Sequence, residues 1–592
     1  MNTDVENLFK DKVLGHPAGL MVLFFTEMWE RFSFYGMRVL LVNFLTTAIV
    51  GANAGWGWSA ENAGALFGTY AMLLYITPII GGYIADKFTG YRWAVVIGAL
   101  IMTFGHAAMA VETELMLYLG LGLLIVGTGF FKPNITSIIS EMYQYNPEKK
   151  DGAYTIFYMG VNAGAFFGMM LCGYLAEKIG WSYGFGLAGV FMLLGTLQFW
   201  LSGNLWGSIG DKPSNVHEAE LGQGITAVKP EDRNDNGDDE PENPFTTLDK
   251  VLMALSAVIG LGYAINDPMS KIGGLDIFSF LEVGGMQGQY VAVLFALALF
   301  LYLVASRIAR YTRIVRDRMI AFIIFAFFTV FFWMSFEQGA SSLIIFARDN
   351  VDRVLTGSSA TIFNIVNTLL TVIPLIIITY VLTILWKKTY SKIPGSNIVL
   401  AICFLGMWGI VGWMLNREFT ADVSEITVSW FSILNSFFII VFATFFSKWW
   451  ESKYNPSAAT KYALGFIIMA VGFGLLAFGA SGISEGVKVS MIWLIFAYLF
   501  HTLGELCLSP VGLSYVSKLV PARMIALMFG MWYLAIAIGN KLAAVVGGQI
   551  ENITKAYDLS TFFMIFTIVP LVAGVAIYAL NPLLKKLMHG VK

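Results

Sequence analysis

Long apolar runs separated by short polar stretches fill most of the chain, beginning at Leu20. A helix needs about 20 mostly apolar residues to cross a bilayer. The first third of the chain offers six such runs, at 20–47, 62–85, 93–111, 115–139, 153–177 and 183–201. They predict six spanning helices, and the pattern as a whole predicts an all-α polytopic membrane protein.

A polar, acidic stretch interrupts this pattern between residues 202 and 249. Its Asp and Glu residues, with Pro, Gly and Asn among them, are typical of a flexible linker. Two more runs follow at 250–265 and 290–306, the first of them short for a span. Eight others lie at 318–347, 359–386, 397–415, 428–450, 462–480, 490–519, 523–548 and 562–584. The total of sixteen helices is even, so both termini should lie on one side of the membrane.

Positive charge is distributed unevenly between the two sides that this topology defines. With the N-terminus inside, 26 of the 37 Lys and Arg residues fall in cytoplasmic segments and seven fall outside. The other four, Arg31, Arg38, Lys132 and Lys541, lie within apolar runs. Because cytoplasmic loops of membrane proteins are enriched in Lys and Arg, we expect both termini to be cytoplasmic.

Composition agrees with a membrane protein, since 57% of the residues are hydrophobic, 13% are charged and the mean hydropathy is +0.70. A net charge of -2 gives no indication of a nucleic-acid partner. The three cysteines, Cys172, Cys403 and Cys507, lie in apolar runs without a pairing pattern, and the five histidines form no ligand motif. We therefore expect no disulfide framework, no metal site and no cofactor.

The first apolar run carries four charged residues that a spanning helix would ordinarily exclude. Glu27, Glu30, Arg31 and Arg38 recur, with Tyr35, at spacings of three, four and seven, which places them on or near one stripe of a helix. Charges at this depth cost several kcal/mol unless they are paired or hydrated, so they mark candidate functional sites. The alternative is an internal ion pair that only orients helices.

Other ionisable groups lie inside later apolar runs. Lys132 stands beside a helix-kinking proline in the fourth run, and we expect a carboxylate of the first helix to be its partner, in preference to snorkelling to the interface. In the second half of the chain, Glu337 and Glu505 lie in runs long enough to span, and Ser509 follows Glu505 by one turn. Each is a candidate for a site inside the membrane.

Amides and aromatic rings occur at comparable depth. Asn162 and Asn435 are candidates, although an isolated asparagine in a spanning helix more often joins two helices. Aromatic residues that can either wall a cavity or fill a core are Tyr70, Tyr75, Trp333 and Trp532. Together with the charged groups they suggest a water-lined site between two bundles, which holds separated cations and anions. A zwitterion fits such a site, and carboxylates that face basic groups can take up protons as their partners move.

At these residues the sequence resembles the proton-dependent oligopeptide transporter family, the peptide branch of the major facilitator superfamily. HPAGL at 16–20, leading into EMWERFSFYG at 27–36, is similar to the first-helix signature of the family. GYIADK at 82–87, followed by GYR at 90–92, resembles the cytoplasmic loop between helices two and three. FFKPN at 130–134, FYMGVN at 157–162, FFWMSFEQ at 331–338 and LGELCLSP at 503–510 extend the likeness along most of the chain.

The resemblance implies a major facilitator fold of two six-helix bundles with a linking helix pair. It divides the chain into a first bundle at 1–203, a linker at 204–249, the linking pair at 250–315 and a second bundle at 316–592. Two of the sixteen predicted helices are not accounted for by this fold. Because Asn435 is the better match to the family asparagine of the eighth helix, we expect an inserted hairpin at about 359–415. The alternative gives that role to Asn367.

The resemblance also implies roles for the buried groups. Glu505, Asn162 and Asn435 would receive the amino terminus of a di- or tripeptide, with Ser509 nearby. Arg38, Lys132 and Tyr35 would hold its carboxylate, and Tyr70 (or Tyr75), Trp333 and Trp532 would line side-chain pockets. Glu27, Glu30 and Arg31 would serve proton coupling together with Lys132, and Glu337 would pair with Arg38 as an extracellular gate. Phe34 departs from the family, which usually has a tyrosine there, so a substrate contact through that hydroxyl is lost.

These observations favour a proton-coupled peptide importer in a bacterial inner membrane, with peptides, protons and the lipid bilayer as partners. No obligate protein partner is expected. An intramembrane hydrolase is disfavoured because His501 and Glu505 lack the second histidine of a zinc helix. A transporter of another small anion or metabolite remains the alternative, since a fold does not determine a substrate.

Overall fold

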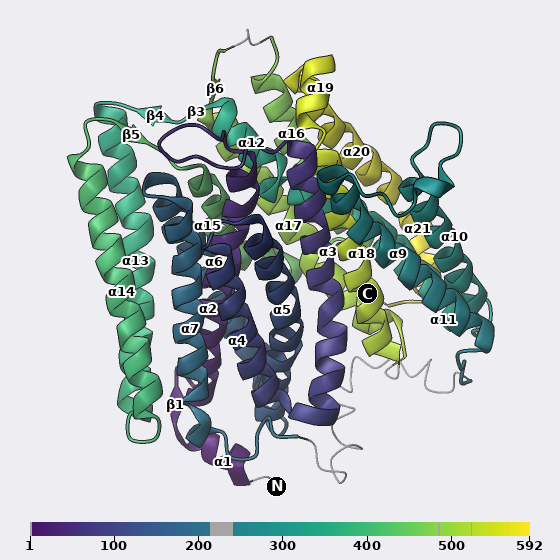
Figure 1. The fold of residues 1–592 in the computed structure, drawn as a ribbon. Helices are drawn as coiled ribbons and strands as arrows, with labels where there is room; N and C mark the ends of the chain where they lie inside the picture. Colours follow the sequence, from purple (N-terminus) through teal and green to yellow (C-terminus); the bar gives the residue numbers. More distant parts are fainter. Residues whose placement is uncertain (1–2, 213–240, 483–485, 522–523, 592) are drawn as a thin grey trace.

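The computed structural model describes residues 3–212, 241–482, 486–521 and 524–591, and these residues are almost entirely helical (Figure 1). Much of the predicted acidic linker lies outside the described residues. A short helix, α1 (Thr3–Lys10), and a strand pair, β1 (Lys12–Val13) with β2 (His16–Pro17), precede the first long helix. We call the face of the molecule that carries α1 the N-terminal face, and the other the opposite face.

Fifteen segments of the described chain are long and apolar enough to cross a membrane, whereas the sequence predicts sixteen. The sixteenth is α2 (Ala18–Thr46), which is 29 residues long but carries the four charged residues discussed above. The structure thus describes a multi-pass membrane protein. The predicted helix at 318–347 is broken by a 3-10 turn at Glu337–Ala340 and by Ser341, whose φ of -132° and ψ of -93° lie outside the helical region.

The first six long helices pack on one another. They are α2, α3 (Ala60–Ile84), α4 (Tyr91–Met109), α5 (Glu114–Met142), α6 (Lys150–Lys178) and α7 (Trp181–Trp200). A π-helical turn (Ala85–Thr89) extends α3, and 3-10 turns lie at Pro147–Lys149 and Gly203–Leu205. Close approach has a local cause: a Cβ on Gly164 of α6 would lie 2.2 Å from the carbonyl oxygen of Met28 on α2.

A second group of helices packs around α16 and α17. Its members are α11 (Arg313–Phe336), η6 (Glu337–Ala340), α12 (Ser342–Asp349), α15 (Val428–Trp450), α16 (Ala458–Gly479), α17 (Met491–Leu519), α18 (Ile525–Gly547), α19 (Ile550–Ala556) and α20 (Leu559–Ala579). The predicted helix at 562–584 ends at Ala579, and a short α21 (Asn581–Leu587) begins there with a proline in its first turn.

Two helices connect the groups, α9 (Thr247–Gly273) and α10 (Gly288–Ile308), with a 3-10 turn (Ser279–Leu281) between them. A capping box formed by Thr246 and Asp249 begins α9. The sequence places the end of this helix at Ile265, but it continues for two more turns. Asn266 and Asp267, which look like helix-ending residues, are fully buried and paired with neighbouring helices.

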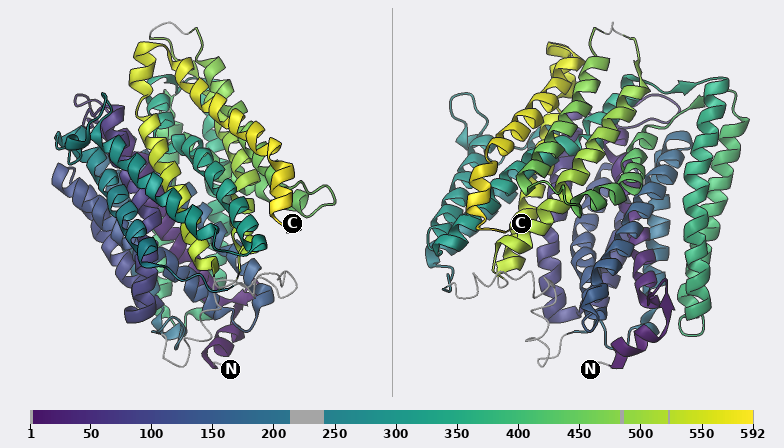
Figure 2. Two further views of the ribbon diagram at one scale, coloured as in Figure 1. Left: turned by 90° about the vertical axis from the view of Figure 1, so that its right-hand side faces the viewer. Right: turned by 180° about the vertical axis from the view of Figure 1, so that it is seen from behind.

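The two residual helices form a hairpin of α13 (Ser358–Thr389) and α14 (Pro394–Thr420), which stands at the edge of the molecule beside α7 (Figure 1). Seen from behind, it lies on the side away from α9 and α10 (Figure 2). Its ends meet, because β4 (Val354–Leu355) pairs antiparallel with β5 (Ser424–Glu425). A second strand pair joins β3 (Val351–Asp352) to β6 (Val489–Ser490) in parallel.

Candidate functional site

A cavity lies between the two groups of helices. Six of the residues that the sequence singles out line it, and they come from five elements: Tyr35 and Arg38 (α2), Asn162 (α6), Glu337 (η6), Asn435 (α15) and Glu505 (α17). Residues more than 400 positions apart therefore share one wall.

One part of the wall carries a carboxylate that is held by an amide. The side-chain nitrogen of Asn435 donates to Glu505 at 3.1 Å and to the hydroxyl of Thr502 at 3.0 Å. Asn162 donates to the carbonyl of Tyr158 at 3.0 Å, which leaves its carbonyl oxygen available to a ligand. Within the described residues Glu505 forms no ion pair. A cationic group of a ligand would find its counter-charge here.

Another part of the wall carries a cation. Arg38 forms an ion pair with Glu337, whose side chain is 6% exposed. The Arg38 guanidinium carbon also lies 5.8 Å from the centre of the Tyr35 ring. Glu337 is the first residue of the turn η6, directly after α11, and its side chain reaches across to α2. The cavity thus has an acidic site and a basic site on its wall.

The charged cluster of α2 lies next to the cavity and outside its walls. The Arg31 guanidinium donates to Glu30 at 2.7 Å and lies 3.3 Å from a carboxylate oxygen of Glu27. All three residues are buried. Two carboxylates thus share one guanidinium, which leaves the group with a net charge of -1 when both acids are ionised. The arrangement can accept one proton and become neutral.

Lys132 does not have the carboxylate partner that we expected. Among the described residues it forms no ion pair, and its ammonium lies 4.8 Å from the centre of the Tyr75 ring. A cation over an aromatic face gains electrostatic stabilisation without a counter-ion. In this conformation Lys132 therefore contacts the tyrosine that the sequence left as the alternative to Tyr70.

The remaining predicted residues do not line the cavity in this structure. Tyr70 is buried, and Trp532 is buried against Phe322 with ring centres 5.9 Å apart. Trp333 is half-buried and packs edge-on against Phe336, which does line the cavity. Ser509 is half-buried one turn beyond Glu505. Asn367, the alternative to Asn435, accepts a hydrogen bond from Trp430 near the hairpin.

Sequence reasoning missed several residues of the wall. Tyr498 and His501 line the cavity and precede Glu505 by seven and four residues, so helical spacing from that glutamate would have found them. Tyr158 precedes Asn162 by one turn. Ser432 lies within 3.5 Å of the Tyr498 hydroxyl.

Polar contacts between the two groups of helices gather toward the opposite face. Arg348 of α12 donates to the hydroxyl of Thr46 on α2 at 2.6 Å. The carboxylate of Glu177, at the end of α6, accepts from the backbone amides of Val428 and Ser429 at 2.7 and 3.0 Å. Together with the Arg38–Glu337 pair, these contacts close the cavity toward the opposite face.

The comparisons with known proteins agree on one family. A sequence model of the POT family matches residues 92–400 and 406–565. The peptide transporter YePEPT of Yersinia enterocolitica is 29% identical over 97% of this chain and 96% of its own. A di-/tripeptide transporter of Lactococcus lactis is 27% identical over 99% and 100%. A crystal structure of a peptide transporter POT in complex with sulfate is similar over 99% of both chains, with a TM-score of 0.70 and 26% identity. The chain belongs to the POT family.

Proposed function

We propose that this protein is a proton-coupled symporter that imports di- and tripeptides by alternating access. The observation that carries the proposal is the presence of Glu505 with Asn435 and of Arg38 on the wall of one cavity. A peptide zwitterion has an ammonium group at one end and a carboxylate at the other, so each end has a partner of opposite charge. The relatives named as peptide transporters support the same substrate class.

In this proposal the peptide amino terminus binds Glu505. Asn435 orients the carboxylate, and the free carbonyl oxygen of Asn162 approaches from α6. The ammonium group then contacts both groups of helices and links its own binding to their relative position. Ser509, Tyr70, Trp333 and Trp532 stay predictions, for a peptide-bound conformation in which the cavity extends toward them.

The peptide carboxylate and the proton both act on the ion pair between Arg38 and Glu337. Arg38 is engaged by Glu337, and a peptide carboxylate competes for the same guanidinium. Protonation of Glu337 weakens its hold on Arg38, which can then bind the peptide with Tyr35 and Lys132. The cluster of Glu27, Glu30 and Arg31 supplies a second place where a proton neutralises net charge. Binding of the proton and binding of the peptide thereby both favour separation of Glu337 from Arg38, and symport requires that the two ligands favour the same conformational change.

The N-terminal face is proposed to be cytoplasmic, with both termini inside and the protein in the bacterial inner membrane. The excess of Lys and Arg in the corresponding segments supports this orientation. The conformation described here is then closed toward the outside. The proposed units are a first bundle ending near residue 203, a linker to 249, a linking pair to 315 and a second bundle that carries the hairpin. The protein transports its substrate without a chemical reaction on it.

A transporter of another small anion is the alternative. Glu505 argues against it, because a buried carboxylate on the cavity wall repels an anion that has no ammonium group. The test is uptake of a labelled dipeptide into proteoliposomes, in competition with unlabelled dipeptide, tripeptide and nitrate. We expect competition by both peptides and none by nitrate. Competition by nitrate alone would overturn the peptide assignment.

A further inference from the structure

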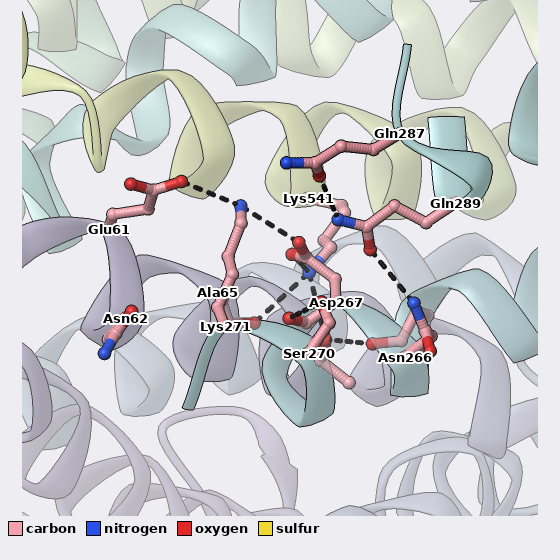
Figure 3. Close-up of polar contacts among 12 residues, drawn as sticks. Glu61, Asn62, Ala65, Asn266, Asp267, Ser270, Lys271, Gln287, Gln289 and Lys541 are labelled. Carbon is pink, nitrogen blue, oxygen red and sulfur yellow. Dashed lines mark hydrogen bonds and ion pairs between the residues drawn. The ribbon is translucent and has the colours of Figure 1, made fainter. Parts of the chain in front are cut away.

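A second group of charged and polar residues, most of them buried, lies away from the cavity, where α3, α9 and α18 meet (Figure 3). It consists of Lys541, Asp267, Lys271, Glu61 and Thr69, which we call the Lys541 network. Asp267 is fully buried, and the side chain of Lys541 is 5% exposed. Burying charges inside a membrane protein costs several kcal/mol unless they are well paired, so their arrangement requires an explanation.

The ammonium group of Lys541 joins three parts of the molecule. It donates to Asp267 of α9 at 2.5 Å. It also donates to Thr69 and to the carbonyl of Ala65, both on α3, at 3.0 and 3.2 Å. Lys541 itself belongs to α18. One side chain thus links the first helix group, the linking pair and the second helix group.

The charges of the network alternate along a line. Lys271 lies 3.0 Å from the other carboxylate oxygen of Asp267 and 3.6 Å from Glu61, which is half-exposed at the start of α3 (Figure 3). Two cations and two anions balance. The Thr69 hydroxyl completes the network by donating to the carbonyl of Ala264 on α9. A helix that only connects two bundles has no need of a buried aspartate in this position.

The helices that the network joins are in close contact. A Cβ on Gly64 would lie 2.6 Å from the carbonyl oxygen of Ala544, and one on Gly68 would lie 2.7 Å from the Ala544 side chain. These residues lie in the first half of α3 and near the end of α18, which is toward the opposite face. If the bundles move apart there to admit substrate, this contact must open, and the bonds from Lys541 to α3 must break.

We propose that the Lys541 network is a second gate on the opposite face, and that α9 takes part in the transport cycle as one of its elements. Asp267 holds Lys541 in reach of Ala65 and Thr69, so α9 stabilises the state in which α3 and α18 are closed. The inference rests on the proposed alternating access, but its test measures conformation without substrate or proton gradient. A failure of this test is therefore separate from a failure of peptide transport.

The experiment measures the distance across the opposite face by pulsed electron spin resonance. Spin labels are placed at Thr113→Cys, before α5, and at Ala556→Cys, at the end of α19, both of which are exposed. The native cysteines are buried, and a parent without the introduced cysteines checks that they stay unlabelled. Lys541→Met removes the bonds to α3 and leaves Asp267 paired with Lys271. We expect a longer distance to appear, with the open-to-closed ratio rising about tenfold, the value of one charge-assisted hydrogen bond.

Asp267→Asn should shift the open-to-closed ratio in the same direction. The double variant of Lys541→Met and Asp267→Asn should have a ratio close to that of either single variant, because the two residues act as a pair. Thr69→Val preserves every charge and should shift it about threefold. This milder variant keeps the test decisive if a charge variant fails to fold.

The matched control is Asp249→Asn at the other end of α9. Asp249 pairs with Arg307 and Arg310, so its ion pairs stay within the linking pair and the segment that follows it. We expect this variant to keep the parent distance distribution. Parent distributions in Lys541→Met, Asp267→Asn and Thr69→Val would overturn the proposal. An equal shift in Asp249→Asn would also overturn it, since any loosening of α9 would then have the same effect.

Discussion

The central cavity and the Lys541 network both bury ionisable groups. The ionisable groups on the cavity wall have few partners, whereas those of the network have several. Among the described residues Glu505 accepts a hydrogen bond from the Asn435 amide and forms no ion pair, and Arg38 has a single carboxylate partner. Lys541 and Asp267, by contrast, are each engaged by more than one group. A group with few partners can accept a ligand or a proton, whereas a group whose partners are complete can only hold or release its neighbours. Under the proposals above, Glu505 and Arg38 therefore bind the two ends of the peptide, whereas Lys541 and Asp267 hold helices together.

The largest difference between variants of the two regions is expected in proton-driven accumulation of peptide. Glu27→Gln or Glu30→Gln removes a proton acceptor from the α2 cluster and should lower accumulation of peptide by more than about tenfold. Counterflow exchange, which needs no net proton movement, should fall by less than about twofold. Lys541→Met should lower both activities alike, by about threefold, because it changes only the conformational balance. Accumulation and counterflow falling together in the glutamate variants would make those residues binding or folding elements.

A second prediction concerns recognition of the peptide amino terminus. A charge-assisted hydrogen bond contributes roughly 1.5 to 3 kcal/mol, so Glu505→Gln should weaken binding of a free dipeptide by about tenfold or more. Binding of the N-acetylated dipeptide, which has no ammonium group, should barely change. Competition against labelled dipeptide measures both affinities. An equal loss for the two ligands would reject Glu505 as the anchor and direct attention to Glu337.

A smaller effect on dipeptide affinity is expected to distinguish Asn435 from Asn367, the two candidates for the family asparagine of the eighth helix. Asn435→Ala removes the amide that orients Glu505 and should weaken dipeptide binding by about fivefold, roughly the value of one hydrogen bond between neutral groups, because Glu505 itself still binds the ammonium group. Asn367 bonds to Trp430 away from the cavity, so Asn367→Ala should leave the affinity within about twofold. The reverse order would move the eighth family helix from α15 to α13.

The smallest effect is expected for the hairpin. Because β4 and β5 pair, the two ends of the insertion lie side by side, and residues 357–421 can be replaced by a short polar turn. We expect dipeptide uptake to remain within about threefold of the parent, since the hairpin contributes no wall residue to the central cavity. Loss of uptake by a deletion protein that is folded and inserted would make the hairpin part of the mechanism.

The sequence predicted the cavity better than it predicted the network, and the reason is physical. The groups of the cavity stand in local patterns, such as the stripe of α2 and the surroundings of Glu505, and these patterns can be read within one helix. Lys541 stands alone in its helix, and Asp267, although it pairs with Lys271 one turn on, lies beyond the predicted end of its helix. Only folding brings Lys541 and Asp267 within 2.5 Å, and a lone buried lysine gives no indication of which distant residue will neutralise it.

Two predicted helix ends were wrong for the same reason. Asn266, Asp267 and Pro268 read as the end of a span, yet α9 continues because Gln289 and Lys541 satisfy those side chains. The break after α11 lies beside Gln338, whose side chain donates to a carbonyl of another helix, a contact that local sequence does not reveal. The number of long helices was predictable from apolar periodicity, because each must be about 20 residues long to cross the bilayer.

Coupling of peptide uptake to a proton gradient is tested most directly by uptake of a labelled dipeptide into proteoliposomes with and without an inward proton gradient at matched external pH. We expect accumulation above equilibrium only with the gradient, and collapse of that accumulation when a protonophore is added. Equal uptake in the two conditions, by protein that still exchanges peptide, would contradict proton coupling and leave a facilitator.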